Sequence, residues 1–331
     1  MWDLVQRVSL DKLSRSVIPF KTDDSFVNLS SYLGRLRLRG SDALDLLDRL
    51  STNRLTDLVA PGMGMGSVLT TNKGRIIDFL GVHLEDDGLL VVTSGAATGK
   101  IEEWIEFYTI MEDVETVDVS DETFHFRILG NTTPSLSNDV AQLAKFHALK
   151  EEICGTECIV IRSQMLGEPC LDVIGPSVAA KTVSQELEVA GIHAELSLDE
   201  YERIRVESGY PAFGTELTED FNPLEAGLIE HISFNKGCYI GQEVVARLNT
   251  YEKVQKKLVK LVWNGTINEK NLSMDGHTAG VITSALDGVG LGFVRNVYAK
   301  FGTVLNCGAT VSYTHLRAHE TEADLVCRLL L

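Results

Sequence analysis

The chain has 331 residues, 44% of them hydrophobic and 23% charged, a composition typical of a globular protein with a buried core. Its formal net charge of −17 argues against broad nucleic-acid binding and against an anionic membrane surface, because both require a basic face. No secretory signal, no run of the ~20 apolar residues of a membrane helix, and no CxxC pair or zinc site is present, so we expect a cytoplasmic protein without a metal.

The first part of the chain predicts a sheet with helices beside it. Residues 31–39 alternate apolar with basic side chains, the pattern of a one-sided strand. Ser41 then offers an N-cap for a helix over about residues 42–50, where leucines recur at helical spacing. Three further strands and one amphipathic helix are predicted at residues 75–84, 89–93, 116–119 and around 101–108.

The second part mixes helices and strands without a regular βαβ rhythm. A polar loop at 131–139 marks a junction between subdomains, and a helix, two strands (157–162, 170–174) and a helix (177–190) follow. Asp199 with Glu202 predicts a capping box for a helix reaching about Glu207, which Gly209 ends. From residue 256 short strands predict a small β-barrel. The expected fold class is α+β.

The segment KGCYIGQE, residues 236–243, concentrates reactive and conformationally free residues. Lys236 lies two positions from Cys238, and a nearby ammonium favours the reactive thiolate. Gly237 and Gly241 permit tight turns and close backbone approach. A plain turn around a small buried cysteine explains the same residues, so the residues alone leave both interpretations open.

This segment closely resembles the signature of the YgfZ-type folate-binding proteins, relatives of the glycine-cleavage T-protein (aminomethyltransferase). Stretches that are similar to this superfamily lie at residues 70–79, 205–217, 221–247 and 279–295, so the resemblance covers about residues 25–308. It implies a cloverleaf of ferredoxin-like subdomains around a central folate cavity over residues 1–252 and a C-terminal β-barrel over 253–311. The implied cofactor is tetrahydrofolate or a one-carbon derivative, and the implied partners are iron–sulfur client or assembly proteins.

The stretch TTNKGRIIDF, residues 70–79, is similar to the T-protein segment in which a strand delivers an aspartate pair to folate. Asp78 matches the first member of that pair, and Phe79 replaces the second. The resemblance implies that Asp78 contacts folate and is catalytic. Which member of the pair is catalytic stays open, so the loss of the second carboxylate argues against aminomethyl transfer.

The stretch RVESGYPAFGTEL, residues 205–217, resembles the T-protein segment whose glutamate holds the pterin ring, and Glu207 is the matching position. A carboxylate suits this role because the pterin edge presents a ring N–H beside an amino group, and two oxygens accept both in parallel. The structural alternative is a salt bridge from Glu207 to Arg203 or Arg205 near the helix end.

The resemblance also implicates residues in and after KGCYIGQE. It implies that Lys236 and Cys238 are catalytic and that Tyr239 contacts folate. Arg247 is a plausible partner for the folate carboxylates, since a guanidinium binds a carboxylate through two parallel hydrogen bonds. Tyr251 stands where YgfZ-type proteins often carry an arginine, which weakens the expected grip on the folate tail.

The final residues, 312–331, do not fit the barrel pattern. His315 and His319 are spaced i, i+4, as in a metal-binding helix. The alternative is a tail foreign to the fold, and we exclude it from functional inference.

Three functions are compatible with these observations. The leading hypothesis is a monomeric tetrahydrofolate-binding protein that acts in iron–sulfur cluster assembly or repair, based on KGCYIGQE and on Phe79. The alternative is a folate-dependent aminomethyltransferase, which Glu207 favours. The third is a non-catalytic folate-dependent scaffold in which Cys238 only packs.

Overall fold

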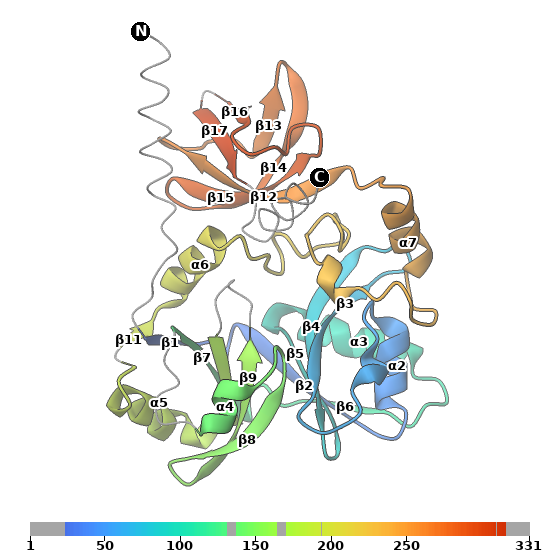
Figure 1. Cartoon of the computed structure of the whole chain (residues 1–331), viewed down its shortest axis with the longest axis vertical. Helices are drawn as coiled ribbons and strands as arrows, with labels where there is room; N and C mark the ends of the chain where they lie inside the picture. The colour runs from blue at the N-terminus through green and yellow to red at the C-terminus, as the bar shows by residue number, and fades with distance from the viewer. Residues whose placement is uncertain (1–23, 131–136, 164–169, 193, 309, 316–331) are drawn as a thin grey trace, which may run out of the picture.

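The computed structural model describes residues 24–130, 137–163, 170–192, 194–308 and 310–315. Within these ranges the chain forms two open sheets and one closed barrel. Figure 1 shows the barrel at one end of the molecule and the two sheets next to each other at the other end. The predicted α+β class is confirmed, whereas a cloverleaf of ferredoxin-like subdomains stays a prediction.

The first sheet has five antiparallel strands. Their order is β3 (Gly64–Thr70), β4 (Ile76–Glu85), β5 (Gly88–Ser94), β2 (Leu33–Arg39) and β6 (Glu115–Asp118). Helices α2 (Ala43–Leu50) and α3 (Thr98–Tyr108) pack their apolar residues against one face. The strands and helices predicted for this region are all present.

One detail at the start of α2 differs from the prediction. The N-cap residue is Asp42 and makes no side-chain capping bond. The Ser41 hydroxyl instead bonds the Asp113 carboxylate, 3.2 Å away, in the loop before β6. The predicted Ser41 cap is therefore wrong, because a tertiary partner binds the hydroxyl that local spacing assigned to the helix.

The second sheet has six strands. Their order is β11 (Ala194–Leu196), β1 (Ser25–Asn28), β7 (Thr123–Leu129), β10 (Cys170–Pro176), β9 (Thr156–Ser163) and β8 (Ala148–Ile153). Helices α4 (Asn138–Gln142) and α5 (Ala180–Val189) contribute to the core on its outer face. Residues 131–136 of the predicted junction lie outside the described residues.

The inner faces of the two sheets meet in a partly polar layer. Leu90 of the first sheet packs with Ile161 and Ile174 of the second. Beside this apolar contact lie buried polar side chains, contributed by Arg35, His83, His125, Arg127 and Asp172. The central pocket opens within this layer.

The C-terminal strands close into a barrel, in the order β12 (Lys256–Trp263), β15 (Val289–Arg295), β14 (His277–Ala285), β13 (Asn271–Met274), β16 (Val304–Cys307) and β17 (Thr310–His315). Strand β17 pairs with both β12 and β16, so it closes the ring. It therefore runs four residues past residue 311, where the predicted barrel ends. Residues 316–331, including His319, lie outside the described residues.

Helix α6 (Leu198–Glu207) lies between the barrel and the sheets, and α7 (Gln242–Thr250) precedes the barrel (Figure 1). The capping box of α6 is formed by Ser197 and Glu200, two residues before the predicted pair. Short 3-10 turns occupy Leu55–Asp57, Gly95–Ala97, Ser177–Ala179 and Ile229–His231. In the described part of the chain, no helix has the length and apolarity needed to cross a membrane.

Candidate functional site

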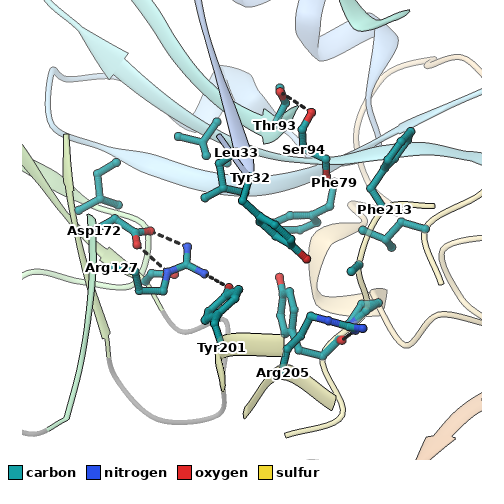
Figure 2. Close-up of a pocket in the computed structure, with 18 of the residues that line it drawn as sticks. Tyr32, Leu33, Phe79, Thr93, Ser94, Arg127, Asp172, Tyr201, Arg205 and Phe213 are labelled. Carbon is teal, nitrogen blue, oxygen red and sulfur yellow. Dashed lines mark hydrogen bonds and ion pairs between the residues drawn. The ribbon is translucent and has the colours of Figure 1, made fainter. Parts of the chain in front are cut away.

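A pocket with a volume of about 230 Å³ lies between the two sheets and is covered by α6 and residues 210–217. Its walls are largely apolar and include six aromatic side chains, from Tyr32, Phe79, Phe146, Tyr201, Tyr210 and Phe213. Figure 2 shows Tyr32 and Phe79 on one side of the cavity and Tyr201 with Arg205 across from them. Aromatic walls of this kind suit a flat ring ligand.

One wall contains a buried ion pair between neighbouring strands. The Arg127 guanidinium of β7 donates to both carboxylate oxygens of Asp172 on β10, at 2.6 and 2.8 Å, and to the Tyr201 hydroxyl at 2.7 Å. Burial alone raises the pKa of Asp172, but the charge of Arg127 outweighs it and holds this pKa well below its usual value. The pair therefore stays ionised and fixes Tyr201 at the pocket.

The opposite wall contains a second buried pair, which reaches the barrel. Arg205 of α6 donates to Glu216 at 3.0 Å and also contacts Glu202. Glu216 in turn accepts hydrogen bonds from Thr283 and Ser284 of β14, the latter at 2.7 Å. This network ties the pocket cover to the barrel.

Both guanidinium groups on the pocket wall are thus neutralised by carboxylates. Arg127 faces Asp172, and Arg205 faces Glu216 and Glu202. Because three carboxylates surround these two guanidiniums, the pocket wall carries no net positive charge, and it offers an aromatic environment with hydroxyl groups at its edge. It suits an uncharged heteroaromatic ring better than a carboxylate or a phosphate.

Asp78 lies directly behind the pocket wall. Its carboxylate is fully buried and accepts bonds from the Ser94 backbone N–H at 2.8 Å and from the Ser94 hydroxyl at 2.9 Å. Burial raises the pKa of Asp78 to about 6. Ser94 lines the pocket, whereas Asp78 does not. The structure thus links Asp78 to the pocket through Ser94.

Phe79, at the position of the second family aspartate, faces the pocket itself. Its ring contacts His231 edge-on, with ring centroids 4.8 Å apart, and lies 6.3 Å from the ring of Phe146. An apolar ring therefore occupies the place where the resemblance leads one to expect a carboxylate (Figure 2).

Two predicted folate contacts lie away from this pocket. Glu207 pairs with Arg203 at 3.4 Å at the end of α6, with a third of its side chain exposed, which is the structural alternative noted for it. Arg247 is exposed on α7. Neither residue lines the pocket, and their roles as folate ligands stay predictions.

Lys236 binds backbone and side-chain oxygens near α2, and no contact joins it to the Cys238 thiol among the described residues. Its ammonium donates to the backbone carbonyls of Asp48, Ser51 and Asn53 at 2.5, 3.0 and 2.6 Å, and the Asp48 carboxylate lies 3.2 Å away. The first two carbonyls belong to the last turn and the C-cap of α2, and the third belongs to the loop that follows. All three donors are used, so the geometry gives no support to activation of Cys238 by Lys236.

The neighbours of Lys236 also lie outside the pocket. Tyr239 is buried beneath the ammonium, 5.4 Å from it to the ring centroid, and burial raises the pKa of Tyr239 to about 12. Cys238 is exposed. The structure brings Lys236 and Tyr239 together but does not bring them to Asp78.

Replacing Lys236 with methionine is expected to lower the free energy of unfolding by about 2–4 kcal/mol, because buried carbonyl groups and Asp48 lose their donor. Urea unfolding measures this loss, and Lys100→Met, at an exposed lysine, serves as the control. The alkylation rate of Cys238, followed by peptide mapping, should not change. Slower alkylation of Cys238 in a Lys236→Met protein of unchanged stability would support the predicted activation of Cys238 by Lys236.

Two of the pocket residues that sequence reasoning missed share one signal. Arg127 and Asp172 each sit inside a largely apolar strand, in the runs FHFRIL and CLDVI, of which the first also contains His125. A charged residue within such a run is expected to be paired when the strand is buried. Ser94 carries no comparable signal, because its role depends on Asp78 of the neighbouring strand.

Comparison with known proteins identifies the family. Residues 26–236 match the GCVT N-terminal domain. The chain is 28% identical to a chloroplast protein of Arabidopsis thaliana named as a transferase, over 85% of this chain and 68% of that protein. It is also 28% identical to an aminomethyltransferase of Caldanaerobacter subterraneus, over 82% of this chain and 77% of that protein.

The fold comparison agrees with this match. The crystal structure of the glycine cleavage system aminomethyltransferase T from Bartonella henselae superposes with a TM-score of 0.77, covering 92% of this chain and 88% of that one at 17% identity. The narrower YgfZ-type assignment stays a prediction, as does the cytoplasmic location. The chain belongs to the glycine-cleavage T-protein (aminomethyltransferase) superfamily.

Proposed function

We propose that this chain binds tetrahydrofolate in the pocket between its two sheets. Members of the aminomethyltransferase family use tetrahydrofolate as substrate or cofactor. The observation that carries the proposal is the pocket of about 230 Å³ with aromatic side chains and no net positive charge, which suits a pterin ring. Because both guanidiniums of the wall are already paired, the carboxylates of the folate tail point toward solvent.

The reaction we propose is transfer of an aminomethyl group to the bound folate, the activity for which the relatives are named. In this chain catalysis rests on positioning, because the described residues that line the pocket include no cysteine or lysine and their carboxylate, Asp172, is engaged by Arg127. Ser94, held by Asp78, supplies a polar group in the same pocket as Phe79. Asp78 then acts through Ser94 and not by direct contact.

A second candidate is folate binding without transfer, in iron–sulfur cluster assembly or repair. The observation that favours it is Phe79, whose ring removes a carboxylate from the pocket wall. The exposed thiol of Cys238 is compatible with this role and lies outside the pocket. The two candidates share the ligand and differ in whether a product forms.

Calorimetry with tetrahydrofolate tests the binding. We expect micromolar affinity, about −8 kcal/mol. Phe213→Ala, which removes a pocket wall, should weaken binding about tenfold, whereas Phe107→Ala, at an exposed ring on α3, should not. Absence of binding by the unmodified chain would overturn the proposal.

The same protein, incubated with tetrahydrofolate and an aminomethyl donor, separates the two candidates. Formation of methylene-tetrahydrofolate identifies a transferase. Binding without this product favours the second candidate.

A further inference from the structure

We propose that Ser94, locked by Asp78, makes the pocket select reduced pterins over oxidised ones. This inference rests on the proposed binding of folate. Ser94 is the residue that distinguishes the reduced from the oxidised pterin ring. Ser94 is the last residue of β5 and lines the pocket, next to Thr93 in Figure 2.

Two hydrogen bonds to one carboxylate fix Ser94. The Asp78 Oδ2 atom accepts from the Ser94 backbone N–H at 2.8 Å, and Oδ1 accepts from the Ser94 hydroxyl at 2.9 Å. The single hydroxyl hydrogen is therefore directed away from any ligand and toward Asp78. What Ser94 Oγ can offer the pocket is its lone pairs, so it acts there as an acceptor only.

Asp78 enforces this polarity because it is buried and ionised. The carboxylate is fully buried, and among the described residues no cation contacts it. An ionised carboxylate accepts hydrogen bonds but does not donate them. If the hydroxyl turned into the pocket, a buried carboxylate oxygen would lose its partner, which is costly. A carboxylate buried without a neighbouring cation destabilises the fold, and such groups are typical of functional sites.

The two oxidation states of a pterin differ in what they show to this acceptor. A tetrahydropterin carries N–H groups on its reduced ring, at N5 and N8. In the oxidised pterin these nitrogens have lone pairs and no hydrogen. Ser94 Oγ, held as an acceptor, can bind the N–H groups of the tetrahydropterin, but it repels the nitrogen lone pairs of the oxidised pterin. A polar group left unpaired in a buried site weakens binding.

The direction of the Ser94 hydroxyl hydrogen depends on the charge of Asp78, so it depends on pH. The groups that bind the carboxylate are the hydroxyl and backbone N–H of Ser94 and the backbone N–H of Phe79, and burial raises its pKa to about 6. Above this pH Asp78 accepts the hydroxyl hydrogen. Below it, a protonated Asp78 donates to Ser94 Oγ, which frees the hydroxyl hydrogen to bind an acceptor in the pocket. Discrimination should therefore decrease as the pH falls through about 6.

The experiment compares dissociation constants for tetrahydrofolate and folic acid, measured anaerobically. The unmodified chain should prefer tetrahydrofolate at neutral pH. Ser94→Ala should reduce this preference roughly 3- to 10-fold, the equivalent of one hydrogen bond. Ser94→Thr keeps the hydroxyl and fits the extended backbone at this position (φ −75°, ψ 131°), so it should restore the preference.

Ser67→Ala is the matched control. Ser67 is a buried serine on β3 of the same sheet, and its hydroxyl accepts a bond from the Asn53 backbone N–H outside the pocket. It should leave the preference unchanged. In the unmodified chain the preference should weaken below pH about 6, and this pH dependence should vanish in Ser94→Ala.

The outcomes separate this inference from the proposed function. If the unmodified chain binds neither ligand, the proposed function fails. If it binds tetrahydrofolate but Ser94→Ala keeps the full preference, only the inference is overturned. Should Ser94→Ala not fold, a pH-independent preference in the unmodified chain overturns the inference equally.

Discussion

Asp172→Ala is expected to lower the free energy of unfolding by about 3–5 kcal/mol, because it leaves the charge of Arg127 buried without its carboxylate. The guanidinium of Arg127 is 1% exposed and makes two short bonds to Asp172. The same substitution removes the carboxylate that orients Arg127, the donor to the Tyr201 hydroxyl, so affinity for tetrahydrofolate should fall with stability.

Urea unfolding of Asp172→Ala measures the loss, with Asp86→Ala as the control. Asp86 forms an exposed ion pair with Lys150, and such pairs contribute roughly 0–1 kcal/mol. The pKa of Asp172 is held far below its unfolded value, so its contribution is complete above pH about 4 and is lost as the pH falls toward the folded pKa. The difference in unfolding free energy between the unmodified chain and Asp172→Ala should therefore become smaller in acid. A loss as small as that of Asp86→Ala would contradict the role assigned to this pair.

Glu216→Ala is the second change with a large expected effect, about 3–5 kcal/mol of unfolding free energy. Glu216 is fully buried and joins Arg205, the backbone N–H of Ala212, and Ser284 of the barrel, at 3.0, 3.1 and 2.7 Å. Its removal should loosen residues 210–217, which cover the pocket. Ligand affinity should decrease even where the protein is still folded.

Equilibrium unfolding and hydrogen exchange over residues 210–217 measure the two effects. Glu219→Ala is the matched control, since Glu219 lies three positions further along and pairs with Lys100 at the surface. Normal protection of residues 210–217 in Glu216→Ala would show that the barrel does not hold the pocket cover.

Local patterns were informative where a segment's structure depends on its own sequence. The predicted strand at 31–39 and helix at 42–50 correspond to β2 and α2, whose leucines pack into one core at strand and helix spacing. The strand is not one-sided as predicted, because Leu33 and Arg35 on its other face are buried as well. The α6 helix was also predicted, although its capping box lies two residues earlier. Strand β7 was missed, because Arg127 stands on a buried face and pairs with Asp172, 45 residues away.

Site residues were harder to predict because their roles depend on distant partners. The nearness of Lys236 to Cys238 in sequence suggested an activated thiol. In the structure Lys236 binds Asp48, 188 positions away, and stabilises the end of α2. For Asp78, the resemblance identified the residue, and only the structure shows that Ser94 stands between it and the pocket.

The sequence by itself determined the α+β class, the superfamily and most helices and strands of the first sheet, since hydrophobic periodicity and motifs are local properties of the chain. Only the tertiary structure decided which polar residues meet at the pocket. Arg127 pairs with Asp172 because the register of β7 and β10 places them opposite each other, and Ser94 meets Asp78 across the neighbouring strands β5 and β4. Register depends on the packing of whole sheets, and no single segment encodes it.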